Sequence, residues 1–196
     1  MAKIVAFGHR KRTGKDTAGG LLHKHLRIIA PELRVEEVSF ALKLKETSYE
    51  LFKWGGLQPG PFYELAENAH LREVVLPLLG KTPRQIWIEV GNLMREVHPD
   101  VWINNALYAE ADIVIVRDLR YHNEANIIEA KGGERYKMVR DGVEISNDVA
   151  DVNLDNYQKW TGLVYNNGTI ADLSDKMLDL AERVVRGIYA QPVAAD

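Results

Sequence analysis

Residues 4–17 bring together the residue types that bind phosphate. A short apolar run, Ile4–Phe7, ends at Gly8, a basic loop follows, and Gly14-Lys15 then opens a segment with helical spacing. This order of strand, loop and helix is that of a phosphate-binding P-loop. Backbone N–H groups of such a loop and the positive end of the helix form a cradle for an anion. Gly14 lets the backbone come close to a phosphate, and Lys15 is placed to reach its outer oxygens.

The loop departs from the usual pattern, G-x-x-x-x-G-K-[ST]. Gly8 lies one residue too early, and His9 stands where the first glycine is expected. Asp16 stands where Ser or Thr is expected, and Thr17 comes next. A carboxylate beside a phosphate is repelled unless a cation lies between them, so we expect Mg²⁺ near Asp16, with Thr17 as the competing ligand. The alternative is a chance glycine-lysine turn before a helix.

A second group of charged residues follows the apolar run Ile113–Val116, which predicts a buried strand. Functional side chains in doubly wound sheets gather at the carboxyl ends of the strands. Asp118 is therefore placed like a Walker B acid that holds Mg²⁺ through water, and Arg120 is placed to meet a phosphate. The alternative is an ordinary Asp–Arg ion pair at a strand end.

A third feature is a helix that begins after Thr82. Thr82 can cap it, Pro83 suits the first helical position, and Gln85 completes a capping box. Arg84 lies in the first turn, where the helix dipole favours an anion. Arg95 lies on the same face about 16 Å along the axis, so the two arginines are not expected to grip one phosphate side by side. A solvated helix face is the alternative for both.

The elements that must position these residues alternate between strand and helix. Strands are predicted at 4–7, 35–40, 113–116, 135–139 and 162–165, and helices at 15–29, 41–54, 62–79, 122–131, after Thr82 and after Thr169. Such alternation predicts a parallel sheet with helices on both faces, and phosphate binding at its carboxyl edge.

Helical spacing also predicts which side chains reach the core. In the helix after Thr82 these are Ile86, Val90, Leu93 and Val97, and in the last helix they are Leu173, Met177, Leu180, Val184 and Ile188. For Trp87 and Trp102, core packing is favoured over stacking on a base. The segment 140–160 is polar and lacks periodicity, which suits either a mobile flap over the site or an ordinary surface loop.

Composition limits the class of protein. The chain has 196 residues, which fits one domain with a small inserted lid, and its 46% hydrophobic content is enough for a core. A net charge of −3 gives no general reason to bind nucleic acid or membrane. The absence of cysteine excludes disulfides and thiolate catalysis and favours an intracellular protein. The first apolar run is too short for a signal peptide, so we expect a cytoplasmic protein without a membrane span.

Together these residues resemble the phage-type deoxynucleoside monophosphate kinases, within the P-loop nucleoside monophosphate kinase superfamily. The G-K-D-T and D-x-R-x-x-N-E pieces are the most specific, and the matching pieces cover nearly the whole chain in the expected order. They are Thr13-Gly14-Lys15-Asp16-Thr17, Phe40-Ala41 with Leu44-Lys45, Thr82-Pro83-Arg84, Gly91 to Arg95, His98-Pro99-Asp100-Val101-Trp102, Asp118-Leu119-Arg120 with Asn123-Glu124, and Asn166-Asn167-Gly168-Thr169.

The resemblance implies a three-layer α/β/α P-loop kinase fold with a central, mainly parallel sheet. It implies one kinase domain, 1–196, with an acceptor-binding helical region at about 41–105 and a lid at about 140–160. It also implies ATP and Mg²⁺ as cofactors, a deoxynucleoside monophosphate as the phosphate acceptor and, commonly, a homodimer. No nucleic acid and no membrane partner are expected, and a phage origin would place the protein in the host cytoplasm.

The resemblance also assigns roles to residues. Lys15, Arg12 and Arg120 are the expected catalytic residues. The expected nucleotide-binding residues are Thr13, Gly14, Lys15, Asp16 and Thr17, and the expected metal ligands are Asp16, Thr17 and Asp118. The expected substrate-binding residues are Lys11, Arg12, Lys45, Arg84, Arg95, Asp118 and Arg120.

Two departures from the family concern the donor phosphates. His9 occupies a glycine position, and the segment 140–160 lacks the arginines that such lids often carry, so their role would pass to Arg10 or Arg12.

Two other interpretations of the function are open. One is a different small-molecule kinase of this fold, of the phosphomevalonate or dephospho-coenzyme A type. The other is a non-catalytic nucleotide-binding or DNA-associated protein, against which the net negative charge counts.

Overall fold

The computed structural model describes residues 2–144 and 149–190, without the side chains of 149 and 150. The chain divides into two compact units. One, the sheet unit, comprises Met1–Val38 and Leu107–Asp196, and the other, the helical unit, comprises Ser39–Ala106. The helical unit covers nearly the residues of the predicted acceptor-binding region, 41–105, but that role stays a prediction. Each unit is described by itself.

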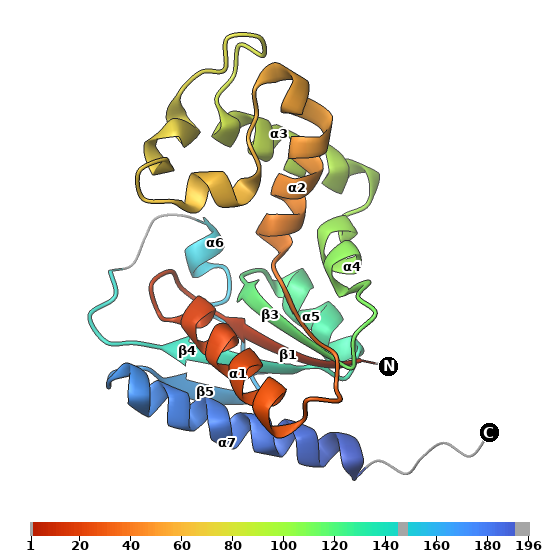
Figure 1. Cartoon of the computed structure of the whole chain (residues 1–196), viewed down its shortest axis with the longest axis vertical. Coiled ribbons are helices and arrows are strands. Elements are labelled where there is room, and N and C mark those ends of the chain that lie inside the picture. Colours follow the sequence, from red (N-terminus) through yellow and green to blue (C-terminus); the bar gives the residue numbers. More distant parts are fainter. Residues whose placement is uncertain (1, 145–148, 191–196) are drawn as a thin grey trace, which may run out of the picture. The chain divides into compact units, whose positions relative to one another are not determined.

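The sheet unit is built on five parallel strands in the order β2-β3-β1-β4-β5 (Figure 1). The strands are β1 Lys3–Gly8, β2 Val35–Val38, β3 Ile113–Leu119, β4 Glu134–Val139 and β5 Gly162–Tyr165. The apolar run that precedes the basic loop therefore forms the central strand, which is buried from Ile4 onward. Because the strands are parallel, their carboxyl ends meet at one edge, where the basic loop begins.

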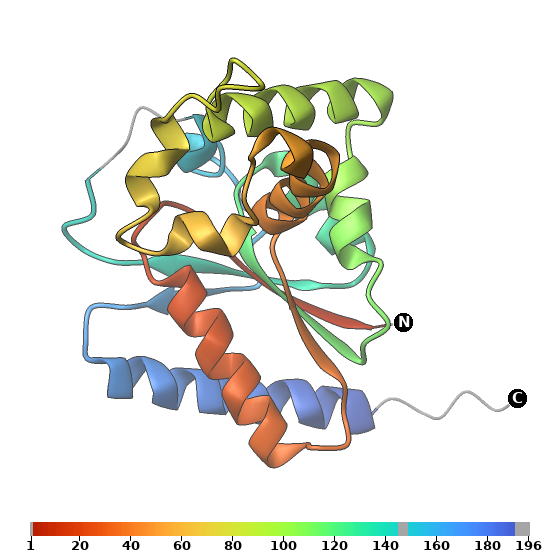
Figure 2. The same ribbon diagram turned by 45° about the horizontal axis from the view of Figure 1, so that its top comes forward.

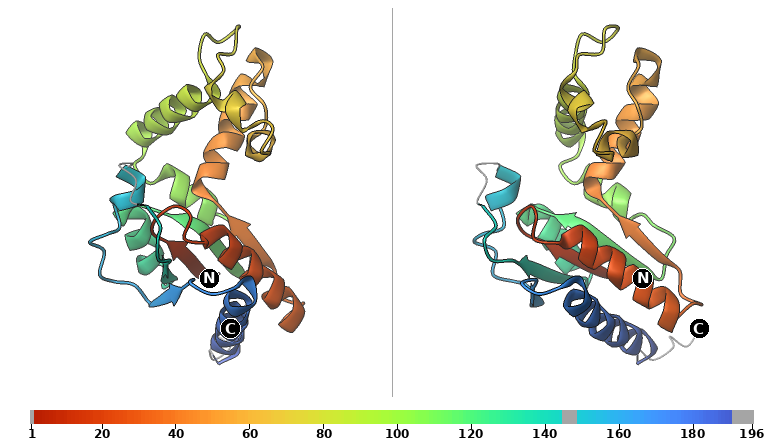
Figure 3. Two further views of the ribbon diagram at one scale, coloured as in Figure 1. Left: turned by 90° about the vertical axis from the view of Figure 1, so that its left-hand side faces the viewer. Right: turned by 60° about the vertical axis from the view of Figure 1, so that its left-hand side comes forward.

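Helices cover both faces of this sheet, so the predicted three-layer P-loop kinase fold is confirmed. The helices are α1 Lys15–Ile29, α5 His122–Ala130, α6 Val149–Val152 and α7 Ile170–Tyr189. On one face α1 and α7 lie side by side (Figure 2), and α5 lies on the opposite side (Figure 3). Alternate strand residues such as Val5 and Phe7 pack with Leu22 of α1 and Met177 of α7 in one core.

The last helix begins as predicted, because Thr169 and Asp172 form a capping box. Its predicted core residues Leu173, Met177, Leu180 and Val184 are buried, and Ile188 packs partly buried against the same core.

The helical unit consists of helices and turns. Its elements are α2 Phe40–Phe52, the 3-10 helices η1 Lys53–Gly55, η2 Gly60–Glu64 and η3 Ala69–Glu73, then α3 Pro83–Val97 and α4 Val101–Leu107, whose last residue lies beyond the unit. The prediction of one helix over 62–79 is wrong, since only short 3-10 turns occur there, followed by a bridge between Leu76 and Lys81. Pro77 lacks the N–H that a helix interior needs and disfavours helical backbone at the residue before it.

Helix α3 starts as predicted, with the capping box of Thr82 and Gln85. Of the four core residues predicted for α3, two are buried and two are exposed. Ile86 and Val90 are buried, whereas Leu93 and Val97 are 59% and 78% exposed. The buried stretch ends at Gly91, where a Cβ would lie 3.3 Å from a methyl group of Leu44 in α2.

Trp87 and Trp102 of the helical unit are buried, which confirms the core prediction for both. The ring of Trp87 packs edge-on against Tyr63, and Trp102 donates its Nε1–H to the carbonyl of Gly91. Trp102 belongs to α4, a helix that the sequence did not predict.

Other differences concern element ends. Strand β3 extends to Leu119, so Arg117 and Asp118 lie within the strand and not after it. Strand β2 stops at Val38, because Ser39 already caps α2 by accepting a hydrogen bond from the N–H of Leu42. Across the described residues, every helix is too short or too polar to cross a membrane.

Burial in the sheet unit leads to a stability prediction. Leu22 is fully buried between α1 and the sheet, so Leu22→Ala should lower the free energy of unfolding by about 2–5 kcal/mol. Leu163 on β5 is 52% exposed, so the matched variant Leu163→Ala should change that energy far less. Urea denaturation monitors both, and equal losses in the two variants would contradict the core described here.

Candidate active site

The basic loop between β1 and α1 has an unusual backbone. His9, Arg12 and Gly14 all have positive φ angles, of 94°, 58° and 97°. Such angles are uncommon for residues with a side chain and persist where the surrounding structure holds them. His9 is held at both ends, since its N–H donates to the carbonyl of Leu119 and its Nε2 lies 2.8 Å from a carboxylate oxygen of Asp155.

Hydrogen bonds close the loop on itself. The carbonyl of Arg10 accepts from the Thr13 hydroxyl at 2.9 Å and from the ammonium of Lys15. From outside the loop, Asn166 donates its side-chain amide to the carbonyl of Thr13 at 3.0 Å. A Cβ on Gly14 would lie 2.3 Å from that amide nitrogen, so only glycine fits here. The turn at Asn166 was recognised in the sequence, but its contact with the loop was not.

Lys15 is the most perturbed cation of the site. Its side chain is buried, with the residue 4% exposed, and its pKa is lowered to about 8, mainly by this burial. The positive charge of Arg120 contributes to the lowering, whereas the carboxylates of Asp16, Asp151 and Asp118 oppose it. The structure therefore brings the charges of Arg120, Asp16 and Asp118, three of the predicted residues, within electrostatic reach of Lys15.

Arg120 is positioned by its backbone and by its side chain. It directly follows β3, which pairs with β1 so that Leu119 lies beside Gly8. The carboxylate of Glu124 accepts from the backbone N–H groups of Arg120 and Tyr121, at 2.7 and 3.0 Å. This bond gives the Asn123-Glu124 part of the sequence motif a physical role: Glu124 fixes the chain where the strand ends.

Two carboxylates that the sequence did not single out contact the basic loop. Asp151 lies in α6, and its Oδ1 accepts from Nη1 of Arg120 at 2.6 Å and from the N–H of Lys11 at 3.2 Å. Asp155 accepts from the guanidinium of Arg10 at 2.8 and 3.2 Å. The hydrogen bond from Arg10 lowers the pKa of the Asp155 carboxyl, and burial lowers the pKa of His9.

These contacts bear on the predicted lid, 140–160. Its described part brings acids to the loop, and Arg10, one of the two residues expected to replace lid arginines, is paired with Asp155. Residues 145–148 lie outside the described residues. The lid itself stays a prediction.

The predicted metal ligands are oxygen donors near Lys15. Asp16 and Thr17 are exposed in the first turn of α1, and Asp118 is partly exposed on β3. Among residues 2–144 and 149–190, no three His, Cys, Asp or Glu side chains group as a metal cage. Mg²⁺ at phosphate sites needs only one or two protein carboxylates, together with water and phosphate oxygens. The carboxylates of Asp16 and Asp118 are both close enough to Lys15 to act on its pKa. Two carboxylates and the Thr17 hydroxyl form a set of oxygen donors that fits Mg²⁺ beside a bound phosphate.

The remaining predicted residues lie elsewhere. Lys11 and Arg12 are exposed on the loop. In the helical unit, Lys45 pairs with Glu64 and lies over the ring of Trp87, Arg84 is exposed and pairs with Glu73, and Arg95 is exposed on α3.

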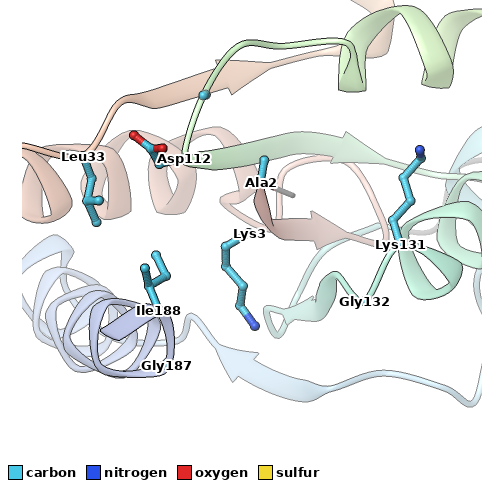
Figure 4. A pocket seen from close by; sticks show the side chains of 9 residues that line it. Ala2, Lys3, Leu33, Asp112, Lys131, Gly132, Gly187 and Ile188 are labelled. Atoms are coloured by element: carbon cyan, nitrogen blue, oxygen red, sulfur yellow. The ribbon is translucent and has the colours of Figure 1, made fainter. Parts of the chain in front are cut away.

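Two cavities lie at opposite edges of the sheet. The one at the carboxyl edge, about 390 Å³, adjoins the loop and is lined by His9, Arg10, Lys137, Val139, Asp155, Leu163 and Tyr165. The other, about 440 Å³, lies at the amino ends of β1 and β3, where Lys3, Asp112 and Lys131 line it (Figure 4). Ligands of open α/β sheets bind at carboxyl ends, so the second cavity is separate from the predicted phosphate site.

A viral protein resembles this chain in sequence over nearly its whole length. The chain is 27% identical over 198 residues to a protein of Acanthamoeba polyphaga mimivirus named "Putative deoxynucleotide monophosphate kinase", covering 91% of this chain and 96% of the relative. No protein-family model matches the chain.

Solved structures give weaker likenesses. A sugar kinase from Janibacter sp. HTCC2649 has a TM-score of 0.46 at 10% identity, covering 96% of this chain and 98% of its own. A shikimate kinase from Aquifex aeolicus has a TM-score of 0.42 at 15% identity, covering 94% and 98%. Because these scores are below 0.5, the fold assignment depends on the parallel sheet and the loop of this chain.

The fold and the likeness to the viral relative together define a phosphotransferase of the P-loop kinase class, and the loop predicted to bind the nucleotide lies at the end of β1. This confirms the predicted fold and enzyme class. The resemblance stated from the sequence is also confirmed, since the viral relative that carries the corresponding name spans nearly the whole chain.

The glycine at the helix start leads to a prediction with an internal control. Gly14→Ala should weaken ATP binding by at least roughly tenfold, because a left-handed residue with a Cβ costs about 1–2 kcal/mol before the clash with Asn166 is counted. Gly20→Ala, in the same helix, meets nothing within 4 Å and should leave binding unchanged. Calorimetric titration with ATP measures both, and a Gly14→Ala protein that binds normally would contradict the loop geometry.

The lowered pKa of Lys15 predicts a pH dependence. The free protein holds the Lys15 proton only below about pH 8, whereas bound phosphates favour the charged form. Affinity for ATP without metal should therefore fall by up to roughly tenfold for each pH unit above 8. Lys15→Arg keeps its charge throughout this range, so its affinity should stay level. Titrations between about pH 7.5 and 9.5 in EDTA compare the two, and parallel curves would exclude Lys15 as the titrating group.

Proposed function

We propose that this protein transfers the γ-phosphoryl group of ATP to a deoxynucleoside monophosphate and so forms the diphosphate. The observation that carries the proposal is the convergence of Lys15 and Arg120 at the carboxyl edge of the sheet. Two cations from separate segments, one on the loop and one after β3, suit a reaction between two phosphate groups. The name of the viral relative supports the choice of acceptor.

The proposed reaction needs no covalent intermediate. An oxygen of the acceptor phosphate attacks the γ-phosphorus in line, and the bond from that phosphorus to the bridging oxygen breaks, leaving ADP. The attacking oxygen of a phosphate dianion carries no proton, so no general base is required. The work of the protein is to orient the two phosphates and to offset the negative charge that develops between them.

The predicted catalytic, nucleotide-binding and metal-binding residues have these roles in the proposal. Lys15 follows the transferred group, while Thr13, Gly14, Asp16 and Thr17 belong to the cradle for the donor phosphates. Bound Mg²⁺, with Asp16, Thr17 or Asp118 as ligands, would supply charge neutralisation between the donor oxygens. Arg12 and Arg120 offset charge at the reacting phosphates.

The acceptor residues complete the proposal. Lys11, Arg12, Asp118 and Arg120 in the sheet unit, and Lys45, Arg84 and Arg95 in the helical unit, are assigned to it by the resemblance. Arg84 forms an exposed ion pair with Glu73. Exposed ion pairs contribute little free energy, so a phosphate that replaces the Glu73 carboxylate loses little stabilisation. A homodimer, a cytoplasmic location and the absence of a nucleic-acid partner stay predictions.

The test of this function is an ATP-coupled assay against all deoxy- and ribonucleoside monophosphates. The panel includes phosphomevalonate and dephospho-coenzyme A, which stand for the other kinases of this fold. Turnover of one or more deoxynucleoside monophosphates well above every other acceptor supports the proposal. Turnover confined to a non-nucleotide acceptor would leave the protein a kinase but overturn this substrate.

Arg120 gives the sharpest mutational prediction. A charge-assisted contact to phosphate is worth about 1.5–3 kcal/mol, so Arg120→Ala should raise the Michaelis constant of the acceptor, lower kcat, or both, by roughly ten- to a hundredfold in kcat/KM. The Michaelis constant for ATP should change much less. Arg34, an exposed arginine paired with Asp112 at the amino edge of the sheet, supplies the matched control Arg34→Ala, which should keep normal kinetics. Loss of ATP binding with acceptor binding intact would place Arg120 on the donor side.

A further inference from the structure

Asp151 joins three segments that are far apart in the sequence. It lies in α6, while its partners lie on the basic loop and directly after β3. Its Oδ1 accepts from Nη1 of Arg120 and from the backbone N–H of Lys11, and its Oδ2 is 3.6 Å from the Lys11 ammonium. One carboxylate thus ties the loop that cradles phosphate to the arginine assigned to the reacting phosphates.

The burial of this carboxylate shows that the contact is built into the site. The Asp151 side chain is 2% exposed, far less than the 30% of Asp155 on the same segment. A buried carboxylate is costly unless its oxygens are paired and hydrogen-bonded. The guanidinium of Arg120, with the N–H and ammonium of Lys11, supplies that compensation.

The geometry leaves Arg120 able to bind a substrate. A guanidinium has five N–H donors, and Asp151 occupies only the Nη1 group. Within the part of the chain that the structure describes, neither Nε nor Nη2 of Arg120 has a protein partner, and the side chain is 23% exposed. Asp151 therefore fixes the Nη1 side of the Arg120 guanidinium and leaves the Nε and Nη2 donors available to a substrate.

Charge repulsion explains why such an anchor is needed. Arg10, Lys11 and Arg12 lie on the loop, Lys15 follows at the start of α1, and Arg120 is close enough to Lys15 to act on its pKa. Without a counter-charge, like charges would drive the flexible Arg120 side chain toward solvent. Asp151 is the buried anion that opposes this.

We propose that Asp151 is a positioning residue, which holds the Arg120 guanidinium against the phosphate loop so that its remaining donors meet the reacting phosphates. This inference rests on the proposed function for its kinetic effect, but not for the contact itself. The contrary possibility is that the Asp151 carboxylate occupies the place of a phosphate oxygen and must leave when ATP binds.

The kinetic test compares Asp151→Asn, which keeps the shape but loses the charge, with Asp151→Glu, which keeps the charge. We expect Asp151→Asn to lower kcat by roughly ten- to a hundredfold while the Michaelis constant for ATP changes less than about threefold. Asp151→Glu should recover part of kcat. Asp112→Asn, which breaks an Asp–Arg contact at the amino edge of the sheet, is the control and should keep normal kcat.

A double-mutant cycle asks whether Asp151 acts through Arg120. In an Arg120→Ala background, Asp151→Asn should lower kcat by less than about a further twofold. Full additivity would overturn the positioning role. Tighter ATP binding and higher activity in Asp151→Asn would also overturn it, in favour of a carboxylate that competes with phosphate. Thermal melting confirms that each variant is folded.

A spectroscopic test separates this inference from the proposed function. The guanidinium resonance of Arg120 in ¹⁵N NMR spectra, assigned from its loss in Arg120→Lys, should report slowed rotation in the wild type and free rotation in Asp151→Asn. An unchanged resonance in Asp151→Asn would overturn the positioning role even in an active enzyme. A protein that phosphorylates no deoxynucleoside monophosphate, yet shows the expected change in this resonance, would overturn only the proposed function.

Discussion

The positive charge of Lys15 has to be kept almost out of water before any nucleotide arrives, and much of the site follows from that constraint. A buried ammonium needs hydrogen-bond acceptors, and the carbonyl of Arg10 supplies one. In this arrangement His9, Arg12 and Gly14 of the loop have left-handed backbone conformations. Asn166 and Leu119, on two other strand ends, then hold the loop in this shape.

Much of the fold was predictable because its signals are local. Central strand β1, helix α1 and strand β5 match the predicted ranges to within one residue, since their apolar runs and turn residues are read directly from the chain. In the region 62–79 the sequence does carry a local signal against a long helix, Pro77, but the short 3-10 turns before it depend on packing against α2 and α3. Leu93 and Val97 show the same limit: helical spacing says which side chains share a face, but not where the neighbouring element stops covering it.

The residues of the candidate site also differ in whether local sequence patterns predict them. The loop from Gly8 to Thr17 is one continuous segment, and its spacing alone indicates phosphate binding. Asp151 and Asp155 meet this loop from about 140 residues away, and nothing in the local pattern around them marks that contact. Arg120 was recognised through the strand that precedes it, whereas the carboxylate that holds it became visible only in three dimensions.

The pairing of β2 with β3 has a consequence for how this chain can vary in length. Val35 lies beside Ile113 and Val38 beside Val116, so the chain leaves β2 at one edge of the sheet and must return to the other edge to start β3. Parallel neighbours cannot be joined by a tight turn and need a crossover of a dozen or more residues. Here the whole helical unit is that crossover. Insertions or deletions within it change the length of a connection and leave the hydrogen-bond ladder of the sheet as it is, so this is where related chains can differ most in size.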